Sequence, residues 1–227
     1  MTENLKTMNC VVAFIDLLGT SQAIKNDIND CNLYSMNYIL QTALDMCSDK
    51  HLTRAEVKVK SFSDNIVFSM DLSNDIDELE QKARVHNIME LCAYFQLAAF
   101  GRGIATRGGI TVGSFFCNDI FVWGKALLRA YYLENKIATY PRIVLDACVV
   151  DLLPECDDLG NKHHAKKDAD GIIFLDYLSF ITMPSRDEYI KRSLQDTEII
   201  IQTLHDDERA IQKVRWIANY LANGLSK

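Results

Sequence analysis

The sequence lacks any apolar run long enough to cross a membrane as a helix. Its longest apolar stretches, residues 9–16 and 142–153, fall well short of the roughly 20 residues that a membrane-spanning helix needs. The first eight residues are polar and have no signal-peptide pattern. These absences predict a cytoplasmic protein without a membrane segment.

The seven cysteines include no CxxC pair that would indicate a zinc or redox motif. Their number is odd, and most lie in apolar runs, where a free thiol behaves as a small hydrophobic group. Low-complexity tracts and fixed-period repeats are also absent. With 48% hydrophobic and 24% charged residues, the composition is that of an ordinary globular protein.

Basic residues are the minority charge, because 24 Lys and Arg stand against 31 Asp and Glu, for a net charge of −7. Nucleic acid binding requires a basic face that meets the phosphates, so nucleic acid is not an expected partner. A small anion such as a triphosphate is not excluded. A local group of Arg and Lys can bind it inside an acidic protein, especially when metal ions are present.

Hydrophobic periodicity predicts the order β-α-β-β-α-β-α-β up to residue 150. The expected elements are a buried strand at 10–15, a helix at 32–47, a hairpin around 63–65, a helix at 75–100, a strand at 104–112, a helix at 124–138 and a strand at 142–150. This mixture predicts an α+β fold, with a ferredoxin-like antiparallel sheet and helices on one face.

The remaining residues predict a loop, a strand and two helices. Residues 154–170 are polar and are expected to form a long exposed loop before a strand at 171–178. Ser185 and Glu188 have capping-box spacing, and Asp206 can cap the last helix. We therefore expect a main domain at residues 1–180 and a C-terminal helical extension at 181–227, packed on the same domain.

Two aspartates are the first candidate functional residues. Asp16 ends the buried strand, and Asp64 lies at the tip of the hairpin. Neighbouring strands would place the two carboxylates side by side, where they repel each other unless a cation intervenes. Mg²⁺ and Mn²⁺ take oxygen ligands and bridge to substrate phosphates. The residues alone leave an alternative open, because an Asp after a strand also caps helices and Ser-Asp-Asn is ordinary turn chemistry.

Three segments resemble, in order, the motifs of class III nucleotide cyclases. They are FIDLLG at 14–19, KSFSD at 60–64, and RGGITVG at 107–113 followed by VWG at 122–124. The similarity spans about residues 9–150, so residues 1–180 would form the cyclase catalytic domain. The resemblance implies a homodimer with active sites at its interface. It also implies two Mn²⁺ or Mg²⁺ ions per site, held by Asp16, Asp64 and the main-chain carbonyl of Leu17.

Further residues are candidates for binding the nucleotide. By the same resemblance, Lys60 would contact the base or ribose, and Phe14 could pack under the nucleotide. Basic residues near the third strand and the following helix are candidates for the triphosphate: Arg102, Arg107, Lys125 and Arg129. Each has a structural alternative, a solvated surface charge for the basic residues and a core position for Phe14. Glu134 is expected to pair with Lys125 or Arg129.

Departures from the family pattern bear on the substrate. Ser63 stands where a Gly usually precedes the second Asp. Leu128 and Tyr132 align with the transition-state Asn and Arg of purine cyclases, and Phe121 aligns with an Asp that helps read adenine. This combination is more similar to the pyrimidine cyclases of bacterial Pycsar anti-phage systems.

That resemblance implies a uridylate cyclase that converts UTP to 3′,5′-cyclic UMP and pyrophosphate. The product would be a second messenger in antiviral defence, sensed by a separate effector protein. Three alternatives stay open. One is a cytidylate cyclase that makes cyclic CMP from CTP, and another is a purine cyclase with displaced catalytic residues. The third is a catalytically inactive cyclase-like module that binds a nucleotide or a partner protein.

Overall fold

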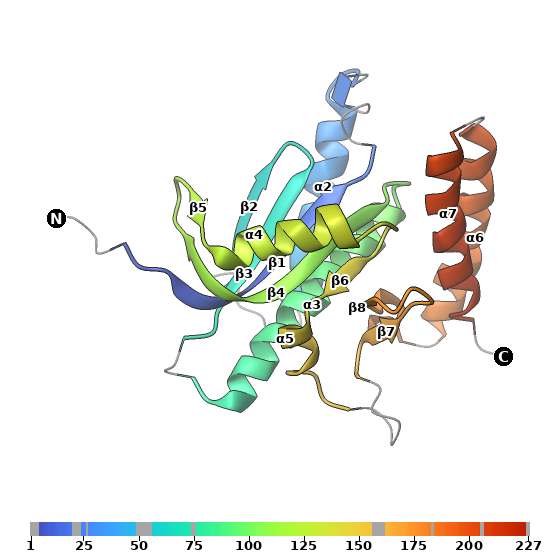
Figure 1. Cartoon of the computed structure of the whole chain (residues 1–227). Helices are drawn as coiled ribbons and strands as arrows, with labels where there is room; N and C mark the ends of the chain where they lie inside the picture. The colour runs from blue at the N-terminus through green and yellow to red at the C-terminus, as the bar shows by residue number, and fades with distance from the viewer. Residues whose placement is uncertain are drawn as a thin grey trace.

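The computed structural model describes residues 5–19, 24–25, 27–48, 56–73, 76–155, 162–182, 184–204 and 207–225. Figure 1 shows one twisted sheet with helices against both of its faces. The strand order is β2-β3-β1-β4-β6-β8-β7, and β5 pairs with β4 outside this path. Within these ranges, no helix is long and apolar enough to span a membrane.

The centre of the sheet is β1 (Met8–Leu17), whose apolar side chains from Cys10 onward are buried on both faces. Val11 and Ile15 enter one core cluster, while Val12 and Phe14 enter a second cluster on the opposite face. Because neither face meets water, the strand reads as a continuous apolar run rather than an alternating one. The expected buried strand at residues 10–15 is confirmed and extends further at both ends.

Strands flank β1 on both sides. The predicted hairpin forms from β2 (Lys58–Phe62) and β3 (Asn65–Asp71), and β3 pairs antiparallel with β1. On the other side, β4 (Thr106–Cys117) pairs antiparallel with the whole of β1 and continues beyond its expected end at residue 112. The short β5 (Val122–Trp123) folds back on β4.

The helices lie on both faces of the sheet. The long α3 (Glu78–Phe100) packs with α2 (Cys31–Ser48) on the face that contains the larger core. On the opposite face α4 (Lys125–Tyr132) packs on β1 and β4 through the small side chains of Ala126 and Ala130. Figure 1 shows α4 in front of the sheet and α3 behind it. The α+β class is confirmed, but the expectation of helices on a single face is corrected.

The long helix α3 starts after Asp77. The Asp77 side chain accepts a hydrogen bond from the N–H of Glu80 at 2.8 Å and so satisfies a donor of the first turn. The expected start at Asp75 lies outside the described residues.

The sheet is mixed rather than purely antiparallel. The strand β6 (Ile143–Leu145) runs parallel to β4. The expected strand at 142–150 is wrong beyond β6, because Asp146 accepts a hydrogen bond from the N–H of Ala147 and caps a short helix, α5 (Ala147–Val150). An apolar run of this length does not distinguish strand from helix, which is why periodicity missed the break.

The sheet ends in two further short strands. β8 (Ile173–Leu175) pairs antiparallel with β6, and β7 (Ala165–Lys167) pairs antiparallel with β8. The polar segment 154–170 is therefore not entirely loop. Lys166 and Lys167 belong to the edge strand β7, which can expose charged side chains to water.

The chain ends, after the short turn η2 (Tyr177–Phe180), in α6 (Ser185–Thr203) and α7 (Glu208–Ala222), which lie side by side. The expected capping box is wrong, because Ser185 is already the first helical residue and the position before it makes no side-chain cap. The residue that caps α7 is Asp207, which accepts a hydrogen bond from the N–H of Ala210 at 3.1 Å. The expected cap, Asp206, lies outside the described residues.

These two helices contact the rest of the fold through apolar side chains and one buried charge. Ile190, Ile217 and Leu221 belong to the main core cluster. The guanidinium of Arg142, fully buried, forms ion pairs with Asp168 and Asp170. Asp168 also accepts a hydrogen bond from the indole N–H of Trp216 in α7 at 2.7 Å. The division at residue 180 stays a prediction.

Candidate active site

The end of β1 brings together the three residues predicted to bind metal. Across the sheet, Asp16 pairs with Asn65 of β3 on one side and with Arg107 of β4 on the other. The main-chain N–H of Leu17 donates to the carbonyl oxygen of Asp64 at 3.0 Å. The hairpin tip is therefore fixed against the end of β1, and Asp16, Leu17 and Asp64 belong to one site.

The hairpin tip holds Asp64 in a two-residue turn. Ser63 has a φ of 54°, in the left-handed region that glycine enters most easily. The side-chain amide of Asn65 donates to Oδ1 of Asp64 at 2.9 Å and orients the carboxylate. This positive φ explains why glycine is usual at this position in the class III cyclase motif that the hairpin resembles. Ser63 adopts the same conformation at an energetic cost.

Arg107 places its guanidinium between two carboxylates. Its Nε donates to Oδ2 of Asp16 at 3.0 Å, and the same Nε lies 2.7 Å from Oε1 of Glu134. Glu134 is only 3% exposed. The expected pairing of Glu134 with Lys125 or Arg129 is therefore wrong, because the carboxylate points to the sheet and not along the helix surface.

A local change of helix type brings Glu134 to this position. The segment η1 (Leu133–Ile137) continues α4 as a π-helix, a rare form that is frequent at functional sites. It lies against Gly109 of β4, where an added Cβ would stand 2.4 Å from Cβ of Leu133 and 2.7 Å from the carbonyl oxygen of Ala130. Only glycine permits this approach. The contact of Glu134 with Arg107 was not predicted from the sequence, although the glycine pair in β4 was a signal that another backbone packs closely there.

The charges at this end of β1 are unbalanced. Burial raises the pKa of Glu134 to about 7, Arg107 opposes the shift, and the charges of Asp16 and Asp64 add to it. The carboxylates of Asp16 and Glu134 therefore share the guanidinium of Arg107, and the charge of Asp64 acts on Glu134 from nearby. Such an excess of negative charge is stabilised when a cation enters.

The donor set fits a hard divalent cation. Two carboxylates, those of Asp16 and Asp64, and the carbonyl of Leu17 offer the oxygen ligands that Mg²⁺ and Mn²⁺ prefer. In the part of the chain that the structure describes, no group of three or more His, Cys, Asp and Glu side chains is arranged as a metal site. Cations held by this smaller set would take further ligands from substrate phosphates or water.

Phe14 and Lys60 lie in one row across the sheet, joined through Val67. Phe14 is 6% exposed and packs edge-on against the ring of Tyr131, with centroids 5.4 Å apart, which is the core position left open as its alternative. Lys60 donates from Nζ to the carbonyl oxygen of Asp119 at 3.0 Å. Its ammonium thus reaches over the sheet to the loop between β4 and β5.

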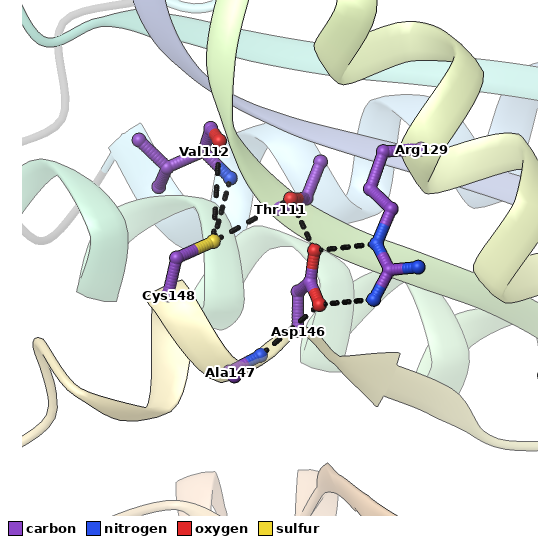
Figure 2. A network of polar contacts seen from close by, with 6 residues as sticks. All are labelled: Thr111, Val112, Arg129, Asp146, Ala147 and Cys148. Carbon is purple, nitrogen blue, oxygen red and sulfur yellow. Dashed lines mark hydrogen bonds and ion pairs between the residues drawn. The ribbon is translucent and has the colours of Figure 1, made fainter.

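Arg129 has a carboxylate partner of its own, as Figure 2 shows. It donates to both oxygens of Asp146, from Nε at 2.8 Å and from Nη2 at 2.6 Å, and the hydroxyl of Thr111 donates to the same carboxylate at 2.7 Å. The hydrogen bond from Arg129 lowers the pKa of Asp146. Among the described residues, no hydrogen bond or ion pair joins Arg129 to Asp16 or Arg107. Sequence spacing grouped it with the triphosphate ligands, but the fold pairs it elsewhere.

Two other basic candidates remain on the surface. Lys125 is exposed at the first position of α4, directly after Gly124. Gly124 has a φ of 148°, and a Cβ there would lie 2.2 Å from the carbonyl oxygen of Ser114, so glycine is required where the helix starts against β4. Arg102 is exposed beyond α3, with its guanidinium 4.3 Å from the ring centroid of Tyr38.

Comparison with known proteins identifies the fold. No protein-family model matches the chain, and no curated protein sequence matches it significantly. Among solved structures, the monomeric guanylyl cyclase domain of the RhoGC fusion protein from the aquatic fungus Blastocladiella emersonii aligns with a TM-score of 0.52 at 10% identity, covering 75% of this chain and 95% of that domain. An atypical dimer of the same domain aligns at 0.50 and 10%, covering 77% and 96%.

The chain therefore has the fold of a class III nucleotide cyclase domain. This is the fold that the three motifs implied, and the strands and loops carrying those motifs are the ones that form the site. The identity is too low to transfer an activity. Function is therefore inferred from the residues at the end of β1.

Proposed function

We propose that this chain is a metal-dependent nucleotide cyclase, a phosphorus–oxygen lyase. The observation that carries the proposal is the meeting of Asp16, Leu17 and Asp64 at the end of β1, beside Arg107, in a cyclase-type fold. In this reaction the ribose 3′-hydroxyl attacks the α-phosphorus of a nucleoside triphosphate and loses its proton. The bond from that phosphorus to the bridging oxygen breaks, which releases pyrophosphate and the 3′,5′-cyclic nucleotide.

Some of these residues are proposed to bind the cations and others the triphosphate. Asp16, Asp64 and the carbonyl of Leu17 would hold two Mn²⁺ or Mg²⁺ ions. When bound, such ions lower the pKa of the attacking hydroxyl and neutralise the leaving pyrophosphate. Arg107 supplies positive charge for the triphosphate beside these residues. Lys125 and the first turn of α4, with its main-chain N–H donors and favourable dipole, lie against Gly113 near the start of β1, and in the proposed homodimer they would serve the site of the partner protomer.

Recognition of the base is assigned to the row of the sheet that contains Phe14 and Lys60. Lys60 contacts the base or ribose, and Phe14 supports this surface from the core. Arg129 supports the site indirectly, because its pair with Asp146 ties α4 to the end of β6.

The proposed substrate is a pyrimidine triphosphate, UTP before CTP. The positions of the purine-cyclase Asn and Arg hold Leu128 and Tyr132, whose side chains are 70% and 46% exposed and cannot replace an amide and a guanidinium. Phe121, at the adenine-reading position, has no carboxylate. These replacements support a smaller base and a different set of transition-state contacts.

The proposed assembly is a homodimer with the active sites at its interface. Large apolar or aromatic side chains are exposed on α4, on β5 and in the loop just before β5, on the face of the molecule that carries the site: Phe121 at 43%, Trp123 at 70%, Leu128 at 70%, Tyr131 at 47% and Tyr132 at 46%. Soluble monomers rarely expose so many large apolar groups close together, and such patches mark interaction surfaces.

In the cell, we propose that the cyclic pyrimidine nucleotide is a second messenger of cytoplasmic anti-phage defence, sensed by a separate effector protein. This role rests on the similarity of the motifs to Pycsar cyclases. It is tested by phage challenge of bacteria that carry this chain and a cyclic-nucleotide-binding effector. Protection that survives Asp64→Ala would contradict it.

The activity itself has a direct test. Purified protein is incubated with Mn²⁺ and each of the four nucleoside triphosphates, and the products are identified by mass spectrometry. We expect cyclic UMP or cyclic CMP with an equal amount of pyrophosphate, and a loss of at least about 100-fold in Asp16→Asn and Asp64→Ala. Product from ATP or GTP alone would move the assignment to a purine cyclase.

A second candidate is a cyclase-like module that binds nucleotide without turnover. The observation in its favour is that Leu128 and Tyr132 are surface residues with no transition-state function, and that Arg129 is matched by Asp146. Mn²⁺-dependent binding of UTP by the wild type without any product would favour this module over the enzyme.

A further inference from the structure

Glu134 has a buried carboxylate oxygen that receives no hydrogen bond. Within the described residues, Oε1 has no hydrogen-bond donor although it lies 2.7 Å from Nε of Arg107. The single hydrogen on that nitrogen points to Oδ2 of Asp16, 3.0 Å away. One N–H therefore stands between two carboxylates and serves only Asp16.

This arrangement destabilises the buried carboxylate of Glu134. A buried carboxylate oxygen without a donor is costly, and a hydrogen bond from a charged donor removes most of that cost. Arg107 is already within reach of Glu134, so a small reorientation of its guanidinium suffices. What opposes this movement is the competing bond to Asp16.

We propose that Glu134 is a positioning residue that receives Arg107 when a divalent cation binds Asp16. The cation and the guanidinium compete for the same carboxylate, so an occupied Asp16 releases the Nε–H, which then donates to Oε1 of Glu134. Arg107 stays anchored beside the site, with its terminal nitrogens available to the triphosphate. The inference rests on the proposed function, because it assigns a cation to Asp16 and a triphosphate to Arg107.

The arrangement makes cation and triphosphate binding cooperative. Without a cation, Arg107 is held by Asp16 and the contribution of Glu134 is small. With a cation, Glu134 is the partner that keeps Arg107 ordered for the phosphates. Removing Glu134 should therefore weaken phosphate binding only when the cation is present, which a purely structural role for this buried carboxylate does not predict.

The test uses Glu134→Gln, which keeps the shape of the side chain and removes its charge, alone and combined with Arg107→Ala. Glu90→Gln is the matched control, since Glu90 is also a buried carboxylate, 8% exposed, but belongs to α3 on the opposite face. Binding of inorganic tripolyphosphate is measured by calorimetry with and without Mn²⁺. This probe contains no base, so it does not depend on the choice of UTP.

With Mn²⁺ we expect about tenfold weaker binding for Glu134→Gln, and a change below about twofold without it. In the Arg107→Ala background, Glu134→Gln should add no further loss, because it acts through Arg107. Glu90→Gln should bind as the wild type does. Additive losses in the double variant, or equal losses with and without Mn²⁺, overturn the inference.

The outcomes separate this inference from the proposed activity. Intact coupling in a protein that forms no cyclic product from any triphosphate overturns the cyclase activity alone. Additive losses in a protein that does form cyclic product overturn the role of Glu134 alone. If the wild type binds no tripolyphosphate in the presence of Mn²⁺, both are overturned.

Discussion

A few single residues adopt strained backbone conformations that the fold requires. Ser63 is the clearest case, because a residue with a Cβ occupies the left-handed region at the tip that holds Asp64. We expect Ser63→Gly to raise the free energy of unfolding by about 1 kcal/mol, since glycine has no Cβ penalty there. Urea denaturation measures this, and Ser63→Ala, which keeps the Cβ, is the control. Equal stability of the glycine and alanine variants would contradict the argument.

His164 gives a prediction about pH at the same scale. Its pKa is lowered from 6.5 to about 4, chiefly by burial and also by the nearby His86 and His163, while Asp176 and Glu90 act in the opposite direction. The ring stacks on Phe180 with centroids 4.0 Å apart.

The unfolded chain binds a proton at His164 at a higher pH than the folded chain does. The neutral ring therefore stabilises the fold fully above about pH 6.5, and stability falls as the pH drops towards 4.

We expect His164→Asn to remove on the order of 1–2 kcal/mol of this pH dependence, a value reduced for partial exposure. Asn tolerates the φ of 58° at this position. Denaturation curves between pH 4 and 7 measure the difference. His163→Asn, at the exposed neighbouring position, should change the slope far less, because His163 is a smaller cause of the shift than burial. An unchanged slope in His164→Asn would refute the prediction.

At the scale of elements, the contact of α4 and η1 with β4 determines whether Glu134 reaches Arg107. A Cβ at Gly109 would collide with Leu133 and with the carbonyl of Ala130. We expect Gly109→Ala to destabilise the fold by about 1–3 kcal/mol and to abolish the Mn²⁺-dependent contribution of Glu134 to phosphate binding.

Gly101→Ala is the control for this change. Gly101 has a φ of −60°, and an added Cβ would lie 3.4 Å from its nearest neighbour, the carbonyl oxygen of Leu97, an ordinary contact. Thermal unfolding and tripolyphosphate binding compare the two variants. If Gly109→Ala behaves like Gly101→Ala, the close approach of the helix is not what positions Glu134.

At the scale of the whole molecule, the exposed aromatic surface on β5 and α4 predicts how two copies associate. We expect Trp123→Glu to raise the dimer dissociation constant at least about tenfold, because a charge is then buried at the centre of the apolar patch. The control Ile199→Glu changes another well-exposed apolar side chain, on α6, which is 59% exposed against 70% for Trp123. Sedimentation velocity should show a dimer for the wild type and Ile199→Glu only. A dimer that survives Trp123→Glu would place the interface elsewhere.

Much of the fold follows from local pattern. The apolar run of β1, the turn residues of the hairpin and the helical spacing of α2 and α3 each record burial on an adjacent stretch of chain, so sequence alone predicts them. Short elements were mispredicted where one apolar run contains two elements, as in residues 142–150, which form β6 and then α5. The assignment of helices to one face also failed, because no local pattern says which face of a sheet a helix will cover.

The two aspartates of the candidate site were within reach of the sequence, since Asp16 ends a strand and Asp64 sits in a turn, both local features. The partners of Arg107 and Arg129 were not. The position of Arg129 near the start of a helix made it a candidate for the triphosphate, and Glu134 was expected to pair within its own helix. Only the packing of α4 on β4, with its π-helical end against Gly109, decided that Arg129 meets Asp146 and that Glu134 meets Arg107. Ion pairs between distant segments depend on how elements pack in space, and a linear pattern does not record that.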